Sequence, residues 1–390
     1  MWIHARTAIR DKTIVDAHNN ILRGTTEAFA AVLGQCNSLH VSPYDEVYQA
    51  PDAFSRRVAR NIQLILRHEC MLTEVIDPAG GSWFVETLTK ELAQKAWEQF
   101  QQIEKDGGIE AGLRSGSIQR QIAALRDQRA QNAGSRKDVV VGVNNYPNPK
   151  EKLPEARPQD WEGVYKKRYA EITTYRQGAE PVEDSKILGL LAQLNENEPG
   201  KVIETAAEAA LLGASLGELS RVIRKGREDG ETIEKLPIFR PSHLYETLRQ
   251  RCEAIGESKG VELSVLQLNI GPSREYRARA DWTTNFLMVG GLRVHADKDF
   301  ATVKEAIAAA AASPSHALVI CSTDEKYAQV VPEIASGIKS LAAKKLIFVA
   351  GAPGDQEAAW KSAGVDGFIN VRIANHPFLE SLISKLEALV

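Results

Sequence analysis

Hydrophobic residues recur at helical spacing in three stretches near the start of the chain. Two helices are predicted over 19–33 and 54–70, each with its apolar residues mostly on one stripe. A third is predicted over 85–104, with charges on the face opposite its apolar residues. The apolar face of this third helix consists of Leu88, Leu92, Ala96 and Ile103. We expect this helix to lie on the outside of a larger body, because only one of its faces is apolar.

Short apolar runs beside these helices predict strands. A strand-like alternation begins at Trp2 with no lead-in, so we expect the chain to start inside a domain. Another strand is predicted over 138–144, DVVVGVN. Helices that alternate with short strands indicate an α/β arrangement, and too few strands are present to close an eight-stranded barrel. Residues 1–145 are therefore predicted to form part of a (β/α)8 barrel.

The middle of the chain changes in composition. Residues 145–185 are rich in Pro and charge and poor in aliphatic residues, which predicts an extended linker across a surface. Helical patterns return over 185–194, 201–212 and 216–225. We therefore expect 146–255 to be a linker followed by a small helical region.

Strands and helices alternate regularly in the last part of the chain. Five strands are predicted over 262–270, 292–294, 317–322, 345–351 and 367–371. Helices are predicted after them, over 274–289, 302–312, 326–341, 356–363 and 377–389. This alternation predicts that 256–390 form a flavodoxin-like, doubly wound parallel sheet, which would bind any ligand at the carboxyl ends of its strands.

Composition narrows the possible partners. The 390 residues are 43% hydrophobic and 25% charged, and the net charge of -3 is spread over both signs, which favours neither nucleic acid nor an anionic membrane. Apolar runs are too short for a signal peptide or a membrane span, so we expect a cytoplasmic protein. The cysteines form no C-x-x-C pair and are expected to be reduced, buried thiols rather than zinc ligands or disulfides. They are Cys36, Cys70, Cys252 and Cys321.

Two loops of the last part lie where a ligand would bind. Residues 271–275 follow the first predicted strand, and no G-x-G-x-x-G is present there, which argues against a dinucleotide site. Residues 351–354, GAPG, fit an anion or cofactor cradle, and a tight strand-to-helix turn explains them equally well.

Several long motifs, in the correct order, resemble methylmalonyl-CoA mutases. They are HNNILRGTTEAFAAVLGQCNSLH, APDAFSRRVARN, DPAGGSWFVE and VVVGVNNYPN. They resemble the last third of that family's acyl-CoA mutase barrel, and the last 130 or so residues resemble its cobalamin-binding domain. The variants PDAFSRRVARN, DPAGGSWFVE and GVNNYPN look most like the small, non-catalytic subunit of the heterodimeric enzymes.

The resemblance implies adenosylcobalamin as the cofactor of the holoenzyme, and it also exposes departures. The family's D-x-H-x-x-G loop, whose His ligates cobalt, falls on Ser273, Glu275 and Ala278, so this chain offers no imidazole there. The signatures S-x-L and G-G, which line the nucleotide tail of the cofactor, fall on Cys321, Thr323, Ala350 and Gly351. Only Gly351 keeps the family's residue type. We expect this chain not to bind the cofactor and to hold no metal.

The barrel part carries further positions implied by the resemblance. An Asn and a Glu that contact the adenosyl ribose in the family fall on Ser42 and Glu46, and a His near the substrate matches His4. A polar Gln of the family is replaced by Arg6. His4, Ser42, Glu46 and Gly351 are thus candidate cofactor-binding residues, although His4 and Glu46 also fit ordinary polar positions at the ends of elements. No catalytic residue is predicted, because the residues that assist migration and grip coenzyme A belong to earlier strands.

These features lead to three hypotheses. The first is a subunit or fragment of an adenosylcobalamin-dependent isomerase that interconverts methylmalonyl-CoA and succinyl-CoA, itself non-catalytic and paired with an active large subunit as a heterodimer. The second is a non-enzymatic module that docks a partner through Arg274, Tyr276, Arg277 and Trp282, residues that a solvated helix face would also explain. The third, a corrinoid carrier for methyl transfer, needs the missing His.

Overall fold

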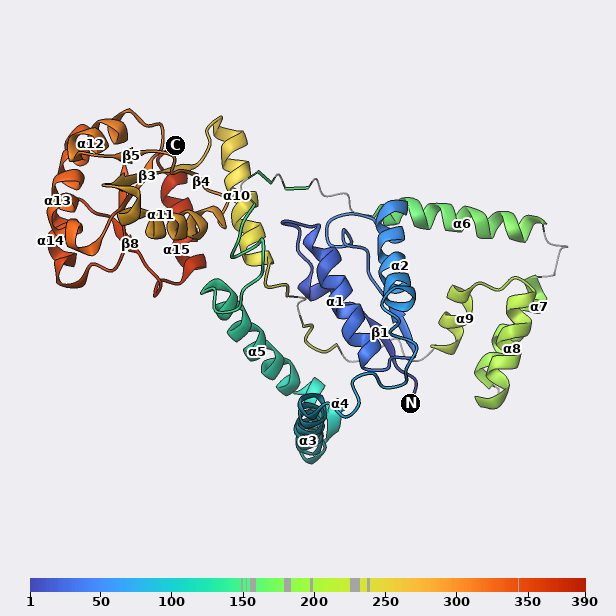
Figure 1. Cartoon of the computed structure of the whole chain (residues 1–390). Helices are drawn as coiled ribbons and strands as arrows, with labels where there is room; N and C mark the ends of the chain where they lie inside the picture. Colours follow the sequence, from blue (N-terminus) through green and yellow to red (C-terminus); the bar gives the residue numbers. More distant parts are fainter. Residues whose placement is uncertain are drawn as a thin grey trace. The chain divides into compact units, whose positions relative to one another are not determined.

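The computed structural model describes residues 1–148, 150–151, 153–154, 159–178, 184–196, 199–224, 232–236, 239–342 and 344–390. The chain divides into two compact units (Figure 1). The first consists of Met1–Arg157 together with Leu236–Val390, and the second is Pro158–Lys235. Both regions in which the sequence predicts strands therefore belong to the same unit.

The first unit begins with two short strands and two helices. Strands β1 (His4–Arg6) and β2 (Ser38–His40) pair in parallel, and helices α1 (Asn19–Leu33) and α2 (Ala53–His68) contact each other. A single 3-10 turn, η1 (Ile9–Asp11), follows β1. The helices predicted over 19–33 and 54–70 are confirmed.

Local sequence explains where α2 starts and what it buries. The Asp52 carboxylate accepts from the backbone N–H of Ser55, and the Ser55 hydroxyl accepts from the backbone N–H of Asp52, which is a capping box. The apolar faces of α1 and α2 meet in a small core. Its buried members are Ala28, Val41, Ala59, Ile62 and Leu66. A core of this size gives β1 and β2 little support from within the described residues.

Three helices follow, α3 (Trp83–Lys105), α4 (Gly108–Arg114) and α5 (Ser117–Gly134). The helix predicted over 85–104 is confirmed as α3, and none of its residues is buried. The sequence did not predict α4 and α5. The second half of α5 contains RDQRAQN, residues 126–132, so its apolar pattern does not continue along the helix.

The strand predicted over 138–144 is wrong. In the described residues this segment forms only an isolated bridge between Val141 and Asn145. Gly142 has a φ of +80°, which bends the chain out of an extended path. The Asn144 side chain holds the bend, because its oxygen accepts from the N–H of Val140 at 2.7 Å. The apolar alternation reflects Val143, which is fully buried in a core shared with the C-terminal part.

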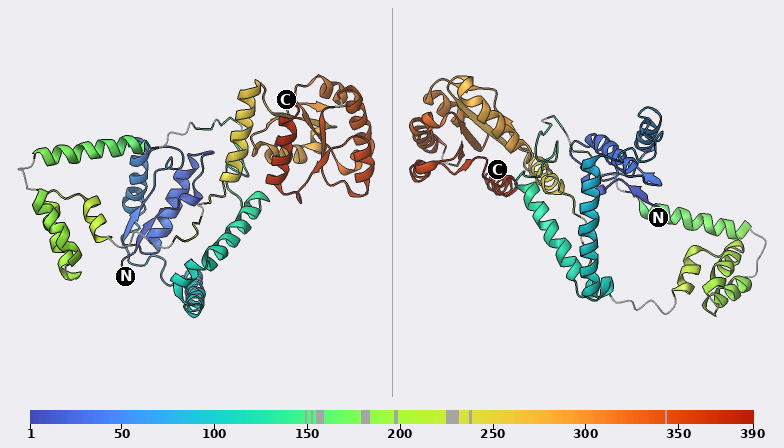
Figure 2. Two further views of the ribbon diagram at one scale, coloured as in Figure 1. Left: turned by 180° about the vertical axis from the view of Figure 1, so that it is seen from behind. Right: turned by 60° about the horizontal axis from the view of Figure 1, so that its bottom comes forward.

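A parallel sheet organises the C-terminal part (Figure 2). Its strands follow the order β4-β3-β6-β7-β8, and the short β5 pairs with the end of β3. The strands are β3 (Ser264–Ile270), β4 (Arg293–His295), β5 (Asp299–Phe300), β6 (Ala317–Cys321), β7 (Leu346–Ala350) and β8 (Gly367–Ile369). The five predicted strands are present, and β5 was not predicted. The expected α/β class with parallel strands is confirmed.

Helices cover this sheet on two faces, each with its own core. The core on one face includes Val265 and Val319, and the core on the other includes Leu268 and Leu318. The helices are α10 (His243–Lys259), α11 (Ser273–Met288), α12 (Val303–Ala312), α13 (Asp324–Leu341), α14 (Glu357–Ser362) and α15 (Asn375–Glu387), with a 3-10 turn η2 (Gly354–Gln356). Helices α10, α11 and α15 contribute to the first core, and α12, α13 and α14 to the second. The boundary expected at residue 256 falls inside α10, whose Cys252 and Ile255 lie in the first core.

The second unit is helical. It contains α6 (Trp161–Gly178), α7 (Asp184–Glu196), α8 (Pro199–Leu211) and α9 (Leu216–Ile223). The helices predicted over 185–194, 201–212 and 216–225 are confirmed as α7, α8 and α9, although Lys225 lies outside the described residues. The extended linker predicted over 145–185 is wrong for 161–178, which form α6; several other residues of that linker lie outside the described residues.

Three further sequence expectations concern thiols, membranes and metals. All four cysteines are free thiols, and Cys252 and Cys321 are buried. Cys36 is half-buried and Cys70 is exposed, so burial was predicted wrongly for these two residues. Among the described residues, no helix is long and apolar enough to cross a membrane. The same residues contain no group of three or more His, Cys, Asp or Glu side chains arranged to hold a metal ion.

Candidate functional site

The pairing of β1 with β2 brings the N-terminal candidate residues together. The parallel register places His4 opposite Ser38 and Arg6 opposite His40. The His4 ring nitrogen Nδ1 lies 2.7 Å from the Ser38 hydroxyl oxygen. The His4 side chain is exposed, and its one described hydrogen bond is with Ser38 on the neighbouring strand β2. His4 is thus held by its sheet and not directed at a carboxylate or a second imidazole.

Arg6 contacts both Ser42 and Glu46. Its Nη2 lies 2.6 Å from Glu46 Oε1, and its Nε donates to the Ser42 hydroxyl at 3.4 Å. The Ser42 backbone N–H donates to the Thr7 hydroxyl, which fixes this loop against the end of β1. The other Glu46 oxygen is buried and has no hydrogen-bond partner among the described residues. Both implied ribose contacts are therefore engaged by the arginine that replaces the family's Gln.

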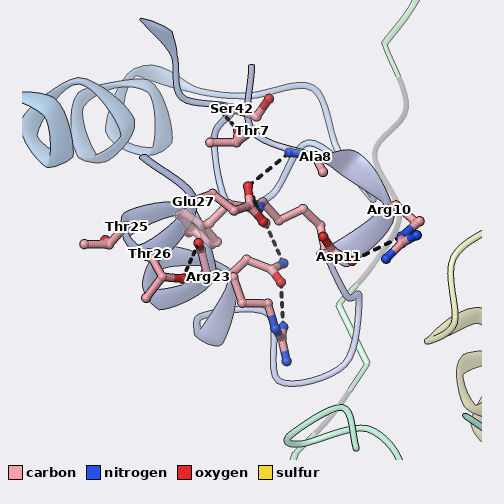
Figure 3. A network of polar contacts seen from close by, with 12 residues as sticks. Thr7, Ala8, Arg10, Asp11, Arg23, Thr25, Thr26, Glu27 and Ser42 are labelled. Atoms are coloured by element: carbon pink, nitrogen blue, oxygen red, sulfur yellow. Dashed lines mark hydrogen bonds and ion pairs between the residues drawn. The ribbon is translucent and has the colours of Figure 1, made fainter. Parts of the chain in front are cut away.

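A network below β1 supports this arrangement (Figure 3). The Lys12 ammonium, only 1% exposed, lies 2.7 Å from both carboxylate oxygens of Glu27, and Glu27 also accepts from the N–H of Ala8. Arg23 donates to Thr13 and to Asn20. Burial lowers the pKa of Arg23 below its ordinary value. The sequence analysis missed this network, in which Glu27 contacts Ala8 and Lys12, and Arg23 contacts Thr13, across 10 to 19 positions of the chain.

At the other site, the sheet places the altered cobalamin-loop positions on the first turns of α11. Ser273 begins the helix, Ala278 is exposed on it, and Glu275 points back towards the strand ends. The Glu275 carboxylate forms an ion pair with Lys326 of α13. A Cβ added at Gly271 would lie 2.7 Å from Glu275 Oε2 and 2.9 Å from Lys326 Nζ, so this pair rests directly on the turn that ends β3. An ion pair thus stands where the resemblance implies an imidazole.

A second ion pair lies beside the first. Arg279 Nη2 is 2.7 Å from Asp324 Oδ2, and the guanidinium carbon lies 5.2 Å from the centre of the Tyr327 ring. The hydrogen bond to Asp324 raises the pKa of Arg279, and Arg279 lowers the pKa of Asp324. Tyr327 is 1% exposed and donates from its hydroxyl to the carbonyl of Ala350 at 2.7 Å. Burial raises the pKa of Tyr327 to about 12, so its hydroxyl stays protonated.

The remaining candidate positions lie around this tyrosine. Cys321 is fully buried at the end of β6, and burial raises the pKa of its thiol to about 12. Thr323 precedes α13 as its N-cap, without a side-chain capping bond. A Cβ added at Gly351 would lie 3.3 Å from both Arg279 Nη1 and Tyr327 Cε2. The positions expected to line a nucleotide tail therefore face Tyr327 and Arg279.

The residues that the sequence analysis missed are Lys326, Arg279, Asp324 and Tyr327. They follow β3 and β6, whose register pairs Asn269 with Cys321. Neighbouring parallel strands end at the same edge of a sheet, so the first turns of the helices that follow them meet there. The pairing of β3 with β6 puts residues 273–279 beside 324–327, but nothing in the local sequence marks the individual partners.

The alternative docking surface on α11 is smaller than expected. Tyr276 and Trp282 are half-buried and pack against the core, and Trp282 stacks on Phe286 at 5.1 Å between ring centres. Arg277 is exposed and pairs with Asp281 one turn along the same helix. Of the four residues expected to form this surface, only Arg274 and Arg277 are exposed.

Comparison with known proteins identifies the family. The sequence profile described as Methylmalonyl-CoA mutase matches residues 1–229. The chain belongs to the methylmalonyl-CoA mutase family. The mutase-family chain is 28% identical over 369 residues to a protein of Porphyromonas gingivalis named methylmalonyl-CoA mutase small subunit, covering 95% of this chain and 48% of that protein. It is 32% identical over 348 residues to a small subunit of the same name from Streptomyces virginiae, covering 89% of this chain and 45% of that protein.

Relatives that are not named as subunits match in the same way. The methylmalonyl-CoA mutase of Rhizobium meliloti is 30% identical over 342 residues, covering 86% of this chain and 48% of the relative. The mutase-family chain thus spans about half the length of the curated relatives it matches. The match to relatives includes the parallel sheet, which the family profile, ending at residue 229, does not cover.

The residues at the strand ends do not fit adenosylcobalamin. The resemblance implies an imidazole with an orienting partner as the cobalt ligand at this position. The mutase-family chain places there a carboxylate that is already paired with Lys326 and pressed against Gly271. Tyr327 and Arg279 lie 3.3 Å from a Cβ added at Gly351, one of the positions that the resemblance assigns to the nucleotide tail.

Proposed function

We propose that this mutase-family chain is a non-catalytic subunit that supports a catalytic large subunit in the interconversion of methylmalonyl-CoA and succinyl-CoA. The cofactor of that holoenzyme, adenosylcobalamin, is carried by the large subunit in this proposal. The observation that carries it is the ion pair between Glu275 and Lys326 at the position where the family offers a cobalt ligand. A carboxylate neutralised by an internal lysine has no role in holding cobalt.

The N-terminal candidates support the same conclusion. Glu46, the one implied ribose contact that keeps its residue type, is bound by Arg6 at 2.6 Å. Each carboxylate expected near the cofactor therefore has an internal cation as its partner, Arg6 for Glu46 and Lys326 for Glu275. Two ion pairs with basic side chains of this chain, at separate sites, argue that both contacts with the cofactor have been given up.

The parallel sheet supports the proposal at the level of fold. If β5 is left aside and the strands are renumbered 1 to 5 in chain order, the order β4-β3-β6-β7-β8 becomes 2-1-3-4-5. This is the order of flavodoxin-like folds. We propose that this is a cobalamin-domain fold kept for structure. Its two cores account for that role without a ligand, because the sheet is covered on both faces.

A partner chain would explain the open surfaces of the N-terminal part. Parallel sheets are normally covered on both faces, and a two-stranded sheet is marginally stable alone. In the described residues β1 pairs only with β2, and apolar side chains nearby are exposed, Leu22 at 66% and Phe54 at 62%. The relatives in P. gingivalis and S. virginiae are named as small and large subunits. We propose that a large mutase subunit covers these surfaces.

The test is an assay of succinyl-CoA formation from methylmalonyl-CoA with adenosylcobalamin added. We expect no activity from the 390-residue chain alone, and activity when the large subunit of the same organism is present. Replacing Glu275 by Gln in this chain should leave the activity of the complex unchanged. Activity of the chain alone, or loss of complex activity in Glu275→Gln, would contradict the proposed function.

A further inference from the structure

Two ion pairs link helices that cover opposite faces of the sheet. Helix α11 belongs to the core on one face and α13 to the core on the other. Glu275 of α11 pairs with Lys326 of α13, and Arg279 of α11 pairs with Asp324 of α13. Each helix thus supplies one acid and one base. The two pairs cross the carboxyl edge of the sheet, where folds of this kind bind ligands.

Both pairs are packed onto the backbone at the strand ends. Gly271 has a φ of +93° and lies so close to Glu275 and Lys326 that an added Cβ would come within 3.0 Å of both side chains. Gly351 approaches Arg279 in the same way, at 3.3 Å. Because Gly271 and Gly351 have no side chain, the ion pairs can pack directly on the backbone at the ends of the strands. Little room is left between the pairs and the sheet.

Tyr327 continues the closure into the interior. Its ring lies under the Arg279 guanidinium, and its hydroxyl accepts from the N–H of Ser322 at 3.0 Å and donates to the carbonyl of Ala350. The ring also meets Trp360 of α14 edge-on at 6.1 Å. The carboxyl edge is therefore filled from the exposed ion pairs down to the buried core.

We propose that the pairs Glu275–Lys326 and Arg279–Asp324 form a latch that joins α11 to α13 and keeps the carboxyl edge of the sheet closed to ligands. This inference rests on the proposed function, in which the edge has no cofactor to admit. The edge is then closed by the four side chains of the two ion pairs, in addition to lacking an imidazole. Restoring a His at position 275 would break one pair but leave Arg279 and Tyr327 in place.

Charge reversal tests the latch, with hydrogen exchange of the α11 and α13 peptides as the readout. Glu275→Lys and Lys326→Glu should each speed exchange of the first turns of α11 by about tenfold, since each puts like charges together. The double variant Glu275→Lys with Lys326→Glu should return exchange to within about threefold of wild type, because the pair is re-formed with reversed charges. Fluorescence of an added apolar dye should rise in the single variants and fall back in the double variant.

The pair Arg277–Asp281 provides the matched control on the same helix. Both side chains are more than 70% exposed, and neither reaches α13 in the described residues. Asp281→Lys should leave exchange at the strand edge unchanged. The latch is disproved if the single variants exchange like wild type, or if the double variant stays as fast as the singles. Both results would leave the proposed function standing, because that proposal fails instead on activity of the chain alone.

Discussion

At the scale of single residues, both candidate sites contain a carboxylate that is paired with a basic side chain of this chain. Glu46 and Glu275 are these carboxylates, at positions where the resemblance implies contacts with the cofactor. Arg6 serves Glu46 from the neighbouring strand, and Lys326 serves Glu275 from α13. Changes in the candidate sites therefore come with compensating partners and not as isolated losses.

Tyr327 is the residue on which closure of the sheet edge most depends. Its hydroxyl pairs the N–H of Ser322 and the carbonyl of Ala350, both inside the protein. Tyr327→Phe leaves the N–H of Ser322 without its partner and leaves the Ala350 carbonyl with only a long contact to Arg279, at 3.5 Å. We therefore expect the free energy of unfolding to fall by about 1–3 kcal/mol, measured by urea denaturation. Tyr276→Phe is the control, because the described structure shows no hydrogen bond to the Tyr276 hydroxyl; it should change stability by less than about 0.5 kcal/mol. Equal stability of Tyr327→Phe and wild type would refute this role.

Some site residues could be predicted from the sequence, and others could not. Ser273, Glu275 and Ala278 were found because they occupy a motif with fixed spacing directly after a predicted strand. Lys326 was not found, since it lies about fifty positions away and only the parallel pairing of β3 with β6 makes the two helices meet. A motif records which residues replace a ligand. Their new partners depend on the tertiary structure.

At the scale of elements, prediction succeeded where the apolar period was sustained. Helix α1 begins and ends where its stripe does, at Asn19 and Leu33, and strands β6 and β7 are continuous apolar runs. It failed over 138–144, where Val143 is buried by α10 and the C-terminal core while Gly142 turns the backbone. Alternating apolar residues show that a segment is half-buried. They do not show that a neighbouring strand exists for it to pair with.

Arg249 of α10 holds this misread segment in place. It is 7% exposed and donates from Nη2 to the carbonyls of Gly142 and Val143, both at 3.0 Å, and from Nε to the carbonyl of Val289. Its Nη1 lies 3.3 Å from the Glu151 carboxylate. The segment is therefore fixed to α10 and to the end of α11 by one buried guanidinium.

Replacing Arg249 by Met should be strongly destabilising. The change removes these bonds and leaves the Glu151 carboxylate without its buried cation, so we expect a loss of about 3–5 kcal/mol in the free energy of unfolding. Arg251→Met, on the same helix, removes a partly exposed pair with Glu387 and should cost no more than about 1 kcal/mol. The measurement is urea denaturation followed by circular dichroism. A loss in Arg249→Met no larger than that in Arg251→Met would show that the segment is held by other contacts.

At the scale of the whole molecule, the N-terminal and C-terminal parts differ in how complete they are. The C-terminal sheet is covered on both faces by helices and has two cores. The N-terminal part has a two-stranded sheet, a core of five buried residues and a helix, α3, none of whose residues is buried. A partner subunit is proposed for the incomplete part only. The closed strand edge belongs to the part that is already complete.

Adenosylcobalamin binding to the purified 390-residue chain tests the central claim most directly. Equilibrium dialysis with the cofactor, read by its visible absorbance, would be run on wild type, Glu275→His and the triple variant Ser273→Asp, Glu275→His, Ala278→Gly. We expect no stoichiometric binding by wild type and none by Glu275→His, because Arg279 and Tyr327 still fill the edge. Stoichiometric binding by the wild-type chain would contradict the account.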